Sequence, residues 1–440
     1  MDILHNIWSV ILLLGTMILV HELGHYWAAL LCDVRVEAFS FGFGPRIFGF
    51  RRGETDFRLS LIPFGGYVKM AGEQLGDENT VVDDPRSFLA KPRWQRMFIA
   101  FAGPFMNVIL AIAVMAGLFM VKFPKVKGAD DPFVVGFVTP DSVADKAGIQ
   151  DGDRVVKFDN KENLTWREVD LIEIGAANRP VPIVLDRNGQ QVLLTVTPKL
   201  EEKYNIGNIG WAPKNELLVQ SLSSGMDAAR VLKQNDVMLA IDGKPVYAVQ
   251  RLHQILKEGQ GKPVELSFVR DGKPMTTTIT PKIAEVGDGT KRYLLGVFLA
   301  PRYVYVQLAP LEAMKESLKV NWAGTGLIYS SLRGIVERRL SAKGLEGPVG
   351  IAKMAGDMTR EGTAEFLNFM CMVSLNLAIF NLLPIPILDG GMILTLLIEM
   401  VMRRDLSMPV KEAVFKMGFV FLMMLVVFVL YNDITKHLPG

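Results

Sequence analysis

The stretch Ile7–Val20, IWSVILLLGTMILV, leads directly into the motif HELGH at residues 21–25. Apart from one serine and one threonine the stretch is apolar, which predicts a membrane-spanning helix. Residues four apart share one face of a helix, so His21 and His25 can bind the same metal ion. Glu22 lies beside them and could take a proton from a metal-activated water molecule. Ionisable groups at membrane depth are costly, so they indicate a functional site.

Two other interpretations of this stretch exist. HExxH is short and also occurs in helices that bind no metal, where the residues are ordinary interfacial groups. Placement in a membrane favours the metal, because two buried histidines and a carboxylate need partners. The stretch also resembles a signal peptide, but it has no basic segment in front and no small-residue cleavage site. We therefore expect a transmembrane helix that is retained.

The composition predicts a membrane protein with a soluble insert. The 440 residues are 50% hydrophobic, and the mean hydropathy is +0.26, which lies between soluble and fully membrane-embedded chains. A net charge of +2 suggests no nucleic-acid partner. Cys32 and Cys371 lie in or beside apolar segments and form no CxxC pair, so we expect small buried side chains and no disulfide framework.

Four segments are long enough to cross a bilayer. We expect transmembrane helices at 1–31, 94–121, 364–402 and 412–432, the third of them broken by two prolines. Basic residues mark the loops expected in the cytoplasm: Arg35, Arg46, Arg51, Arg52, Arg58, Lys69, Arg86, Lys91 and Arg93 in the first, and Arg403, Arg404 and Lys411 in the second. Both termini and the insert between the second and third helices then face the other side.

The insert contains an internal repeat. Thr197-Pro198-Lys199 recurs at 280–282, and Asp153 recurs as Asp236, at one offset of about 83 residues. Alternating strands and a turn at Asn188-Gly189 or Asp271-Gly272 make each copy a small β-rich α+β domain, expected at 130–207 and 208–300. The following segment, 308–360, is expected to be helical and amphipathic, with a helix at 308–339 that lies at the membrane surface or packs on these domains.

The two copies resemble tandem PDZ domains. Phe133–Asp153 looks like the PDZ run of strand, helix start and Gly-Asp turn, whereas the second copy departs from it at Ala229-Arg230 and Asn235-Asp236. PDZ domains bind extended peptides by adding a strand to a sheet edge, so a peptide is an expected partner, less so for the second copy. The alternative is that the copies are spacers or plugs without a ligand.

A third metal ligand is expected in the broken helix. The segment 381–391, NLLPIPILDGG, interrupts an apolar run with Pro384 and Pro386 and continues to Asp389. Irregular backbone at membrane depth is tolerated where it lines a cavity, and a catalytic zinc usually has three protein ligands. Asp389 is therefore predicted as a ligand. The alternative role, capping the helix that follows, rarely justifies a carboxylate inside a membrane.

HELGH together with NLLPIPILDG resembles the site-2 protease family of intramembrane metalloproteases, and the four-span layout is similar to its branch that regulates sigma-E in bacteria. The resemblance covers nearly the whole chain and implies Zn²⁺ held by His21, His25 and Asp389, with Glu22 as general base. It further implies a membrane-re-entrant β segment within 32–93. The residues it implies for substrate binding are Asn381, Pro384, Pro386, Gly65, Gly66 and Tyr67. One departure is Met392, where relatives often have histidine; that position is not a ligand in the family.

The function expected from this resemblance is a zinc endopeptidase in the bacterial inner membrane. It would cleave single-pass substrates of the anti-sigma factor type within the bilayer after a first cut on the outer side, with the PDZ-like copies in the periplasm. Two alternatives are a relative acting on signal-peptide remnants and a PDZ-bearing scaffold without activity. Intact Glu22 and Asp389 argue against the scaffold. A transporter is disfavoured by about four spans without an inverted repeat.

Overall fold

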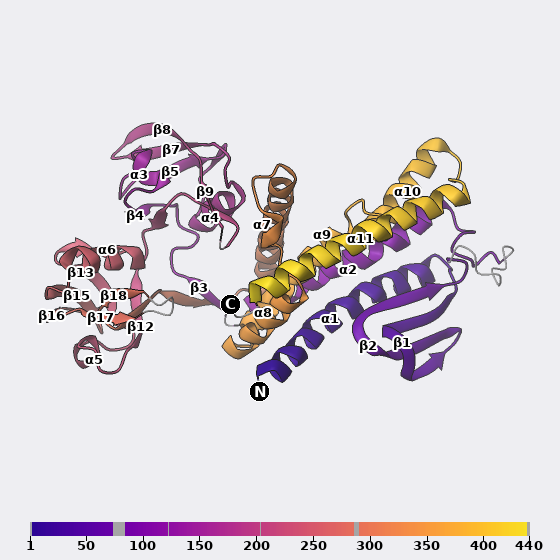
Figure 1. Ribbon diagram of the computed structural model, residues 1–440, viewed down its shortest axis with the longest axis horizontal. Coiled ribbons are helices and arrows are strands. Elements are labelled where there is room, and N and C mark those ends of the chain that lie inside the picture. Colours follow the sequence, from indigo (N-terminus) through magenta and orange to yellow (C-terminus); the bar gives the residue numbers. More distant parts are fainter. Residues whose placement is uncertain (1, 74–83, 122, 203, 286–289, 438–440) are drawn as a thin grey trace. The chain divides into compact units, whose positions relative to one another are not determined.

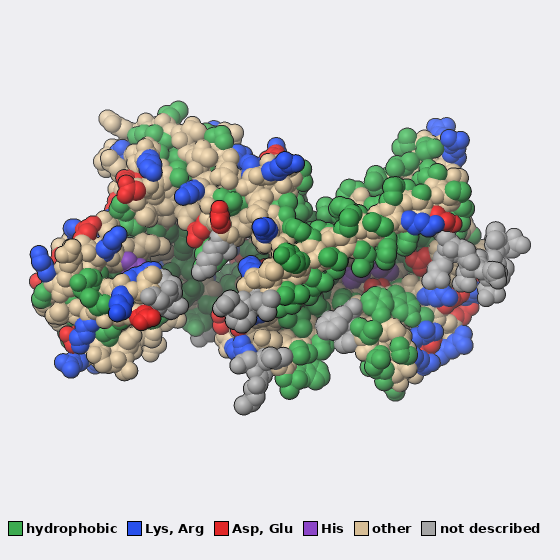
Figure 2. Space-filling model, viewed as in Figure 1, with side chains coloured by type: hydrophobic (Ala, Val, Ile, Leu, Met, Phe, Trp, Pro, Cys, Tyr) green, Lys and Arg blue, Asp and Glu red, His purple; other side chains and the backbone are tan. Residues whose placement is uncertain are grey.

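The computed structural model describes residues 2–121, 123–202, 204–285 and 290–437, except for 74–83. The chain forms two compact units (Figure 1). The first comprises Met1–Val121, Gln307–Ile328 and Leu345–Gly440, and the second comprises Lys122–Val306 and Tyr329–Gly344. Hydrophobic side chains cover the helices of the first unit, whereas charged side chains are scattered over the second (Figure 2).

The first unit is built from long helices. In chain order they are α1 (Asp2–Leu31), α2 (Arg93–Met120), α7 (Pro310–Val336), whose last turns belong to the second unit, α8 (Pro348–Glu361), α9 (Thr363–Asn381), α10 (Asp389–Met402) and α11 (Met408–His437). Within the described residues four helices are long and apolar enough to cross a membrane: α1, α2, α9 and α11. This confirms the expected number of spans. The segment 308–360 contains two helices, α7 and α8, with a short 3₁₀ turn between them.

Helix α2 lies at the centre of the first unit and contacts α1, α9 and α10. Small residues allow the closest approach, because a Cβ at Gly24 of α1 would lie 2.3 Å from the carbonyl oxygen of Ala102 in α2. Nearer the middle of α1, Leu13 and Met17 are fully buried in a cluster with Phe366 of α9. This packing brings the end of α1 and the start of α10 to the same helix.

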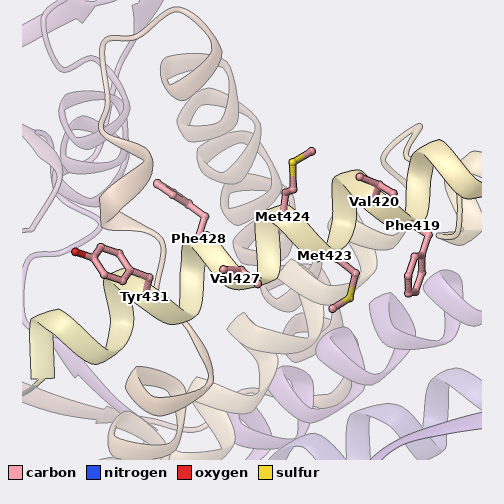
Figure 3. Close-up of a pocket in the computed structure, with 7 residues that line it drawn as sticks. All are labelled: Phe419, Val420, Met423, Met424, Val427, Phe428 and Tyr431. Atoms are coloured by element: carbon pink, nitrogen blue, oxygen red, sulfur yellow. The ribbon is translucent and has the colours of Figure 1, made fainter.

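Helix α11 exposes most of its apolar surface. Figure 3 shows the side chains that line a shallow pocket on it: Phe419, Val420, Met423, Met424, Val427, Phe428 and Tyr431. In the most apolar 18-residue stretch of α11, only 6% is buried within the protein, against 39% in the corresponding stretch of each of the other three candidate spans. In a bilayer, acyl chains would solvate such a surface. Its contact with the rest of the unit includes Gly418, where a Cβ would lie 2.4 Å from Pro386 Cβ.

A curled sheet follows α1 in the first unit. It consists of β1 (Val36–Arg52) and β2 (Thr55–Met70). Residues near the start of β1 pair on both sides, since Ser40 is opposite Tyr67 as well as Arg58. Among the described residues, the stretch Gly66–Met70 therefore pairs with β1 alone and forms an edge of the sheet. The sheet packs on the end of α1 through Val36, Phe39 and Met70.

The second unit contains two copies of one arrangement. The first copy consists of β4 (Val135–Val138), α3 (Val143–Lys146), β5 (Arg154–Phe158), β6 (Lys161–Glu162), α4 (Trp166–Gly175), β7 (Val181–Arg187), β8 (Gln190–Val196), β9 (Lys199–Glu201), β10 (Ile206–Asn208) and β11 (Trp211–Pro213). The second consists of β12 (Leu217–Leu222), α5 (Ala228–Val231), β13 (Val237–Ile241), β14 (Lys244–Pro245), α6 (Val249–Gly259), β15 (Val264–Arg270), β16 (Lys273–Ile279), β17 (Lys282–Glu285), β18 (Lys291–Leu294) and β19 (Val297–Pro301). Two outer strands, β3 (Phe123–Val126) and β20 (Tyr303–Val306), pair with each other.

Each copy has its own apolar core and the same buried ion pair. Arg187 contacts Asp153 at 2.7 Å, and Arg270 contacts Asp236 at the same distance. Both aspartates are at most 2% exposed. One boundary expected from the sequence is placed too early. Ile209 belongs to the first core, and β11 pairs with β4, so the first copy extends to Pro213 rather than to residue 207. The closing strand follows an irregular stretch, which hid it from the repeat pattern.

Candidate active site

Two histidines meet on one face of α1, as their spacing predicts. Nε2 of His21 lies 3.2 Å from Nε2 of His25. His21 is 8% exposed, and the two rings stand almost perpendicular, at 82°. Both Nε2 atoms therefore face one point between the rings, where a cation can accept both lone pairs.

Asp389, which is distant from both histidines in the sequence, joins this pair. Its two carboxylate oxygens lie 3.3 Å from His21 Nε2 and 3.5 Å from His25 Nε2. Asp389 is the first residue of α10 and makes no side-chain cap, because Leu388 occupies the capping position. The capping role considered from the sequence is thus not seen in this helix.

The turn between α9 and α10 holds Asp389 in place. Gly390 and Gly391 fit against the turn itself, since a Cβ on either would lie 2.3 Å from a backbone oxygen of residues 382–385. Ile387 has φ of +93°, a strained conformation for a β-branched residue. Such strain persists only where the surroundings over-determine the backbone, and it is typical of functional sites.

The spacing of the three groups fits a small divalent cation. His21, His25 and Asp389 each offer one ligand atom, and these three atoms lie within 4.8 Å of one another. Ligands at about 2.0 Å from a tetrahedral ion lie about 3.3 Å apart. The observed separations of 3.2, 3.3 and 3.5 Å match this value. Two imidazoles and one carboxylate are also a donor set that zinc accepts, with a fourth position left for water or substrate.

Helix α2 supplies partners for the other ring nitrogens, which the sequence did not reveal. His25 Nδ1 lies 2.8 Å from the carbonyl oxygen of Ile99, so Nδ1 carries the proton and Nε2 is free to bind metal. Asn107 is fully buried, and its Nδ2 is placed 3.2 Å from His21 Nδ1. Its Oδ1 has no partner among the described residues. With the amide flipped, Oδ1 accepts the Nδ1 proton of His21.

Two glycines make room for the catalytic groups. A Cβ at Gly103 of α2 would lie 2.3 Å from His25 Nε2 and 2.9 Å from His21 Cε1. A Cβ at Gly66 of β2 would lie 3.0 Å from Glu22 Cγ. Glu22, from the same turn of α1 as His21, therefore lies against the edge of the curled sheet. Gly66 was expected at the site from the sequence, whereas Gly103 was not.

The other residues expected to bind substrate lie on two segments. Gly65 has φ of +137°, and a Cβ there would overlap the Phe43 ring. Tyr67 stacks on that ring with centroids 6.3 Å apart. Asn381 ends α9 and is half-buried, and Pro384 and Pro386 follow in the turn that leads to Asp389.

Comparison with known proteins decides the family. Residues 9–425 match the family model described as peptidase family M50. The chain belongs to this family. As an M50 peptidase that carries HExxH at a membrane-spanning helix, it is a zinc metalloprotease of the membrane.

Its relatives match over their whole length. The chain is 30% identical to "Regulator of sigma-E protease RseP" of Salmonella typhimurium, over 99% of this chain and 100% of that protein. It is 30% identical to "Protease RseP" of Yersinia pestis over the same shares. It is 31% identical to "Putative zinc metalloprotease" of Treponema pallidum, over 97% of this chain and 98% of that protein. One similar solved structure is the PDZ domain of an SdrC-like protein from Listeria monocytogenes, 21% identical over 20% of this chain and 92% of that one, with a TM-score of 0.18.

Proposed function

We propose that this M50 peptidase cleaves single-pass transmembrane proteins within the bilayer, with zinc held by His21, His25 and Asp389. The convergence of these three groups, with ligand-like spacing of 3.2 to 3.5 Å, carries the proposal. The partners of both histidines at Nδ1 support it, because they leave each Nε2 lone pair available.

The chemistry divides between the metal and the chain. Bound zinc lowers the pKa of a water molecule towards neutrality and stabilises negative charge on a peptide oxygen. Glu22 takes the proton of the attacking water and later gives it to the leaving amine. Gly66 leaves room for the Glu22 side chain, and the hydrogen bonds at Nδ1 hold both rings so that the protein does not have to reorganise during the reaction.

The substrate must be extended where it is cut, because a helix ties its carbonyl groups into its own hydrogen bonds. The edge at Gly66–Val68 adjoins Glu22, and β1 is the only strand that pairs with it in the described structure. An unwound substrate can add to this edge as a further strand, which satisfies the amides that lipid cannot. Tyr67 and Gly65 would line that strand, and Asn381 with the two prolines would line its other side.

Topology follows from charge. The protein is an inner-membrane protein by its spans and its relatives. The basic residues at 35–93 and 403–411 favour a cytoplasmic side for those loops. The two copies of the second unit are then periplasmic and PDZ-like, and the curled sheet is the re-entrant segment beside the active site. The substrates proposed are of the anti-sigma factor type, trimmed first on the outer side; signal-peptide remnants are the alternative.

The first experiment compares wild type with Glu22→Gln on a trimmed single-pass substrate in detergent. We expect only the wild type to cleave, while both bind zinc equally, because Glu22 is not a ligand. If neither cleaves although the wild type retains zinc, the substrate is wrong or the chain is a scaffold. Equal cleavage by both would exclude Glu22 as the base.

A second experiment tests whether the second unit excludes substrates with intact outer domains. Residues 128–301 can be replaced by a short glycine linker, because Lys127 N donates to Arg302 O at 2.7 Å and the two ends are adjacent. We expect the shortened protein to cleave an untrimmed substrate that the full chain refuses. Continued refusal would contradict the filter.

A further inference from the structure

In the first copy, a side-chain carboxylate accepts a hydrogen bond from the backbone amide of a buried turn. Glu173 projects from α4, and its Oε1 accepts from the N–H of Ile209 at 2.6 Å. Its Oε2 accepts from the indole N–H of Trp211 at 2.7 Å. Glu173 is 8% exposed and Ile209 is fully buried. Helix α4 packs closely on β10, the strand that precedes Ile209, since a Cβ at Gly207 would lie 2.3 Å from the Glu173 carbonyl oxygen.

The neighbouring amide is occupied as well. The N–H of Gly210 donates to Oδ1 of Asn208 at 2.7 Å. The turn Asn208–Trp211, which we name the first amide loop, thus directs two successive N–H groups at side-chain oxygens of its own copy. Successive backbone amides that open a strand form a site for carboxylates, including the free carboxyl end of a peptide.

The second copy has the same loop without either acceptor. The second amide loop, Leu294–Val297, corresponds to the first, because Gly296 O accepts from Ser223 N at 2.8 Å as Gly210 O accepts from Thr139 N at 2.8 Å. Leucine replaces both acceptors: Leu256 stands where the offset of the repeat places Glu173, and Leu294 stands in the place of Asn208. In the described part of the chain no acceptor is found for the N–H of Leu295 or Gly296.

We propose that Glu173 is a built-in substitute for a ligand carboxylate, which closes the first amide loop to the carboxyl ends of peptides. The side chain fills the position that a terminal carboxylate would take and bonds the amide that would hold it. The inference rests on the PDZ-like character proposed above, and its test involves no cleavage, so failure of the protease assignment would not affect the result.

The test measures peptide binding to the full chain in detergent at pH 7.5. The probe is a fluorescein-labelled peptide of five alanines and a terminal valine, prepared with a free carboxyl end and with an amidated end. We expect Glu173→Ala to bind the free-acid probe at least tenfold more tightly than wild type does. The amidated probe should show no gain, because it lacks the charge that the amides would hold.

Two further variants distinguish the loss of the Glu173 carboxylate from a general destabilisation of α4. Glu168 lies on the same helix and forms a capping box with Thr165, so Glu168→Ala weakens the helix without touching the loop and should show no gain. The reciprocal change Leu256→Glu should abolish any free-acid binding at the second loop. A folded Glu173→Ala protein without gain, or an equal gain in Glu168→Ala, overturns the proposal.

Hydrogen exchange of wild type tests the same point if Glu173→Ala does not fold. Ile209 is 0% exposed and Leu295 is 2% exposed, so the two amides are matched in burial. We expect the Ile209 amide to exchange at least tenfold more slowly than the Leu295 amide, because only the former has an acceptor. Equal exchange would overturn the proposal.

Discussion

Gly103 of α2 lies so close to His25 of α1 that a Cβ would be 2.3 Å from Nε2. A contact this short cannot be relieved without moving the ring or the helix. We predict that Gly103→Ala displaces the histidines and weakens zinc binding at least tenfold, with a loss of stability of about 1–3 kcal/mol from overpacking. Zinc affinity is measured by competition with a chelator.

The matched control is Gly117→Ala on the same helix. A Cβ at Gly117 meets nothing within 4 Å, so this change should stabilise the helix slightly, by about 0.5–1 kcal/mol. If both alanine variants bind zinc like wild type, close packing at Gly103 is not needed for the site.

Asn107 is predicted to orient His21. Its removal in Asn107→Ala leaves the Nδ1 proton of a ligand without an acceptor, which should lower zinc affinity by about 10–100-fold. Asn107→Asp should retain most of the affinity, because a carboxylate also accepts that proton. Asn321→Ala, at a buried asparagine of α7, is the control and should leave zinc binding unchanged. Unchanged affinity in Asn107→Ala would exclude this orienting role.

Gly66 is predicted to be needed for catalysis rather than for metal binding. A Cβ there lies 2.9 Å from Ser40 O and 3.0 Å from Glu22 Cγ, so valine would displace Glu22 and block the sheet edge. Gly66→Val should lose at least tenfold in cleavage rate and keep its zinc. Gly49→Val clashes with the Phe57 carbonyl oxygen elsewhere in the same sheet and should cost less activity; an equal loss would mean that general damage to the sheet is responsible.

The first copy is predicted to lose stability as pH rises. Burial raises the pKa of Glu173 to about 7, against the hydrogen bonds from Ile209 and Trp211. Burial, with the charge of Glu173, also raises the pKa of Asp170 to about 7. A carboxyl whose folded pKa is raised contributes stability that is complete below about pH 4.5 and is lost as pH rises through 7, up to about 3 kcal/mol for one group.

Glu173→Gln should remove part of this dependence, and adding Asp170→Asn should remove the remainder. The measurement is hydrogen exchange of the core strands β7 and β8 between pH 5 and pH 8, corrected for intrinsic exchange rates. A wild-type protein whose protection does not change over this range would contradict the prediction.

Local regularities made much of this molecule predictable. The spans are visible because a helix must cover its backbone with apolar side chains to cross a bilayer. The two histidines share a face because the helix repeat places residues four apart on the same side. The ion pairs at Asp153 and Asp236 recur because the two copies repeat the same sequence pattern at one offset. The boundary expected after residue 207 separates Trp211 from the first copy. Its partner β4 lies at the opposite end of that copy, and no local pattern marks the pairing.

Hydropathy and helix periodicity were enough to predict that α1 presents His21 and His25 together in an apolar helix, and the proline-broken segment that follows α9 pointed to Asp389 as their partner. The way in which α2 completes this site, through the Ile99 carbonyl, Gly103 and Asn107, depends on helix packing that no local pattern reveals. The same holds for the contact of Glu173 with the Ile209 amide. The physical reason is that helix periodicity acts over a few residues, whereas close approach and hydrogen-bond partners between distant segments depend on how whole elements pack.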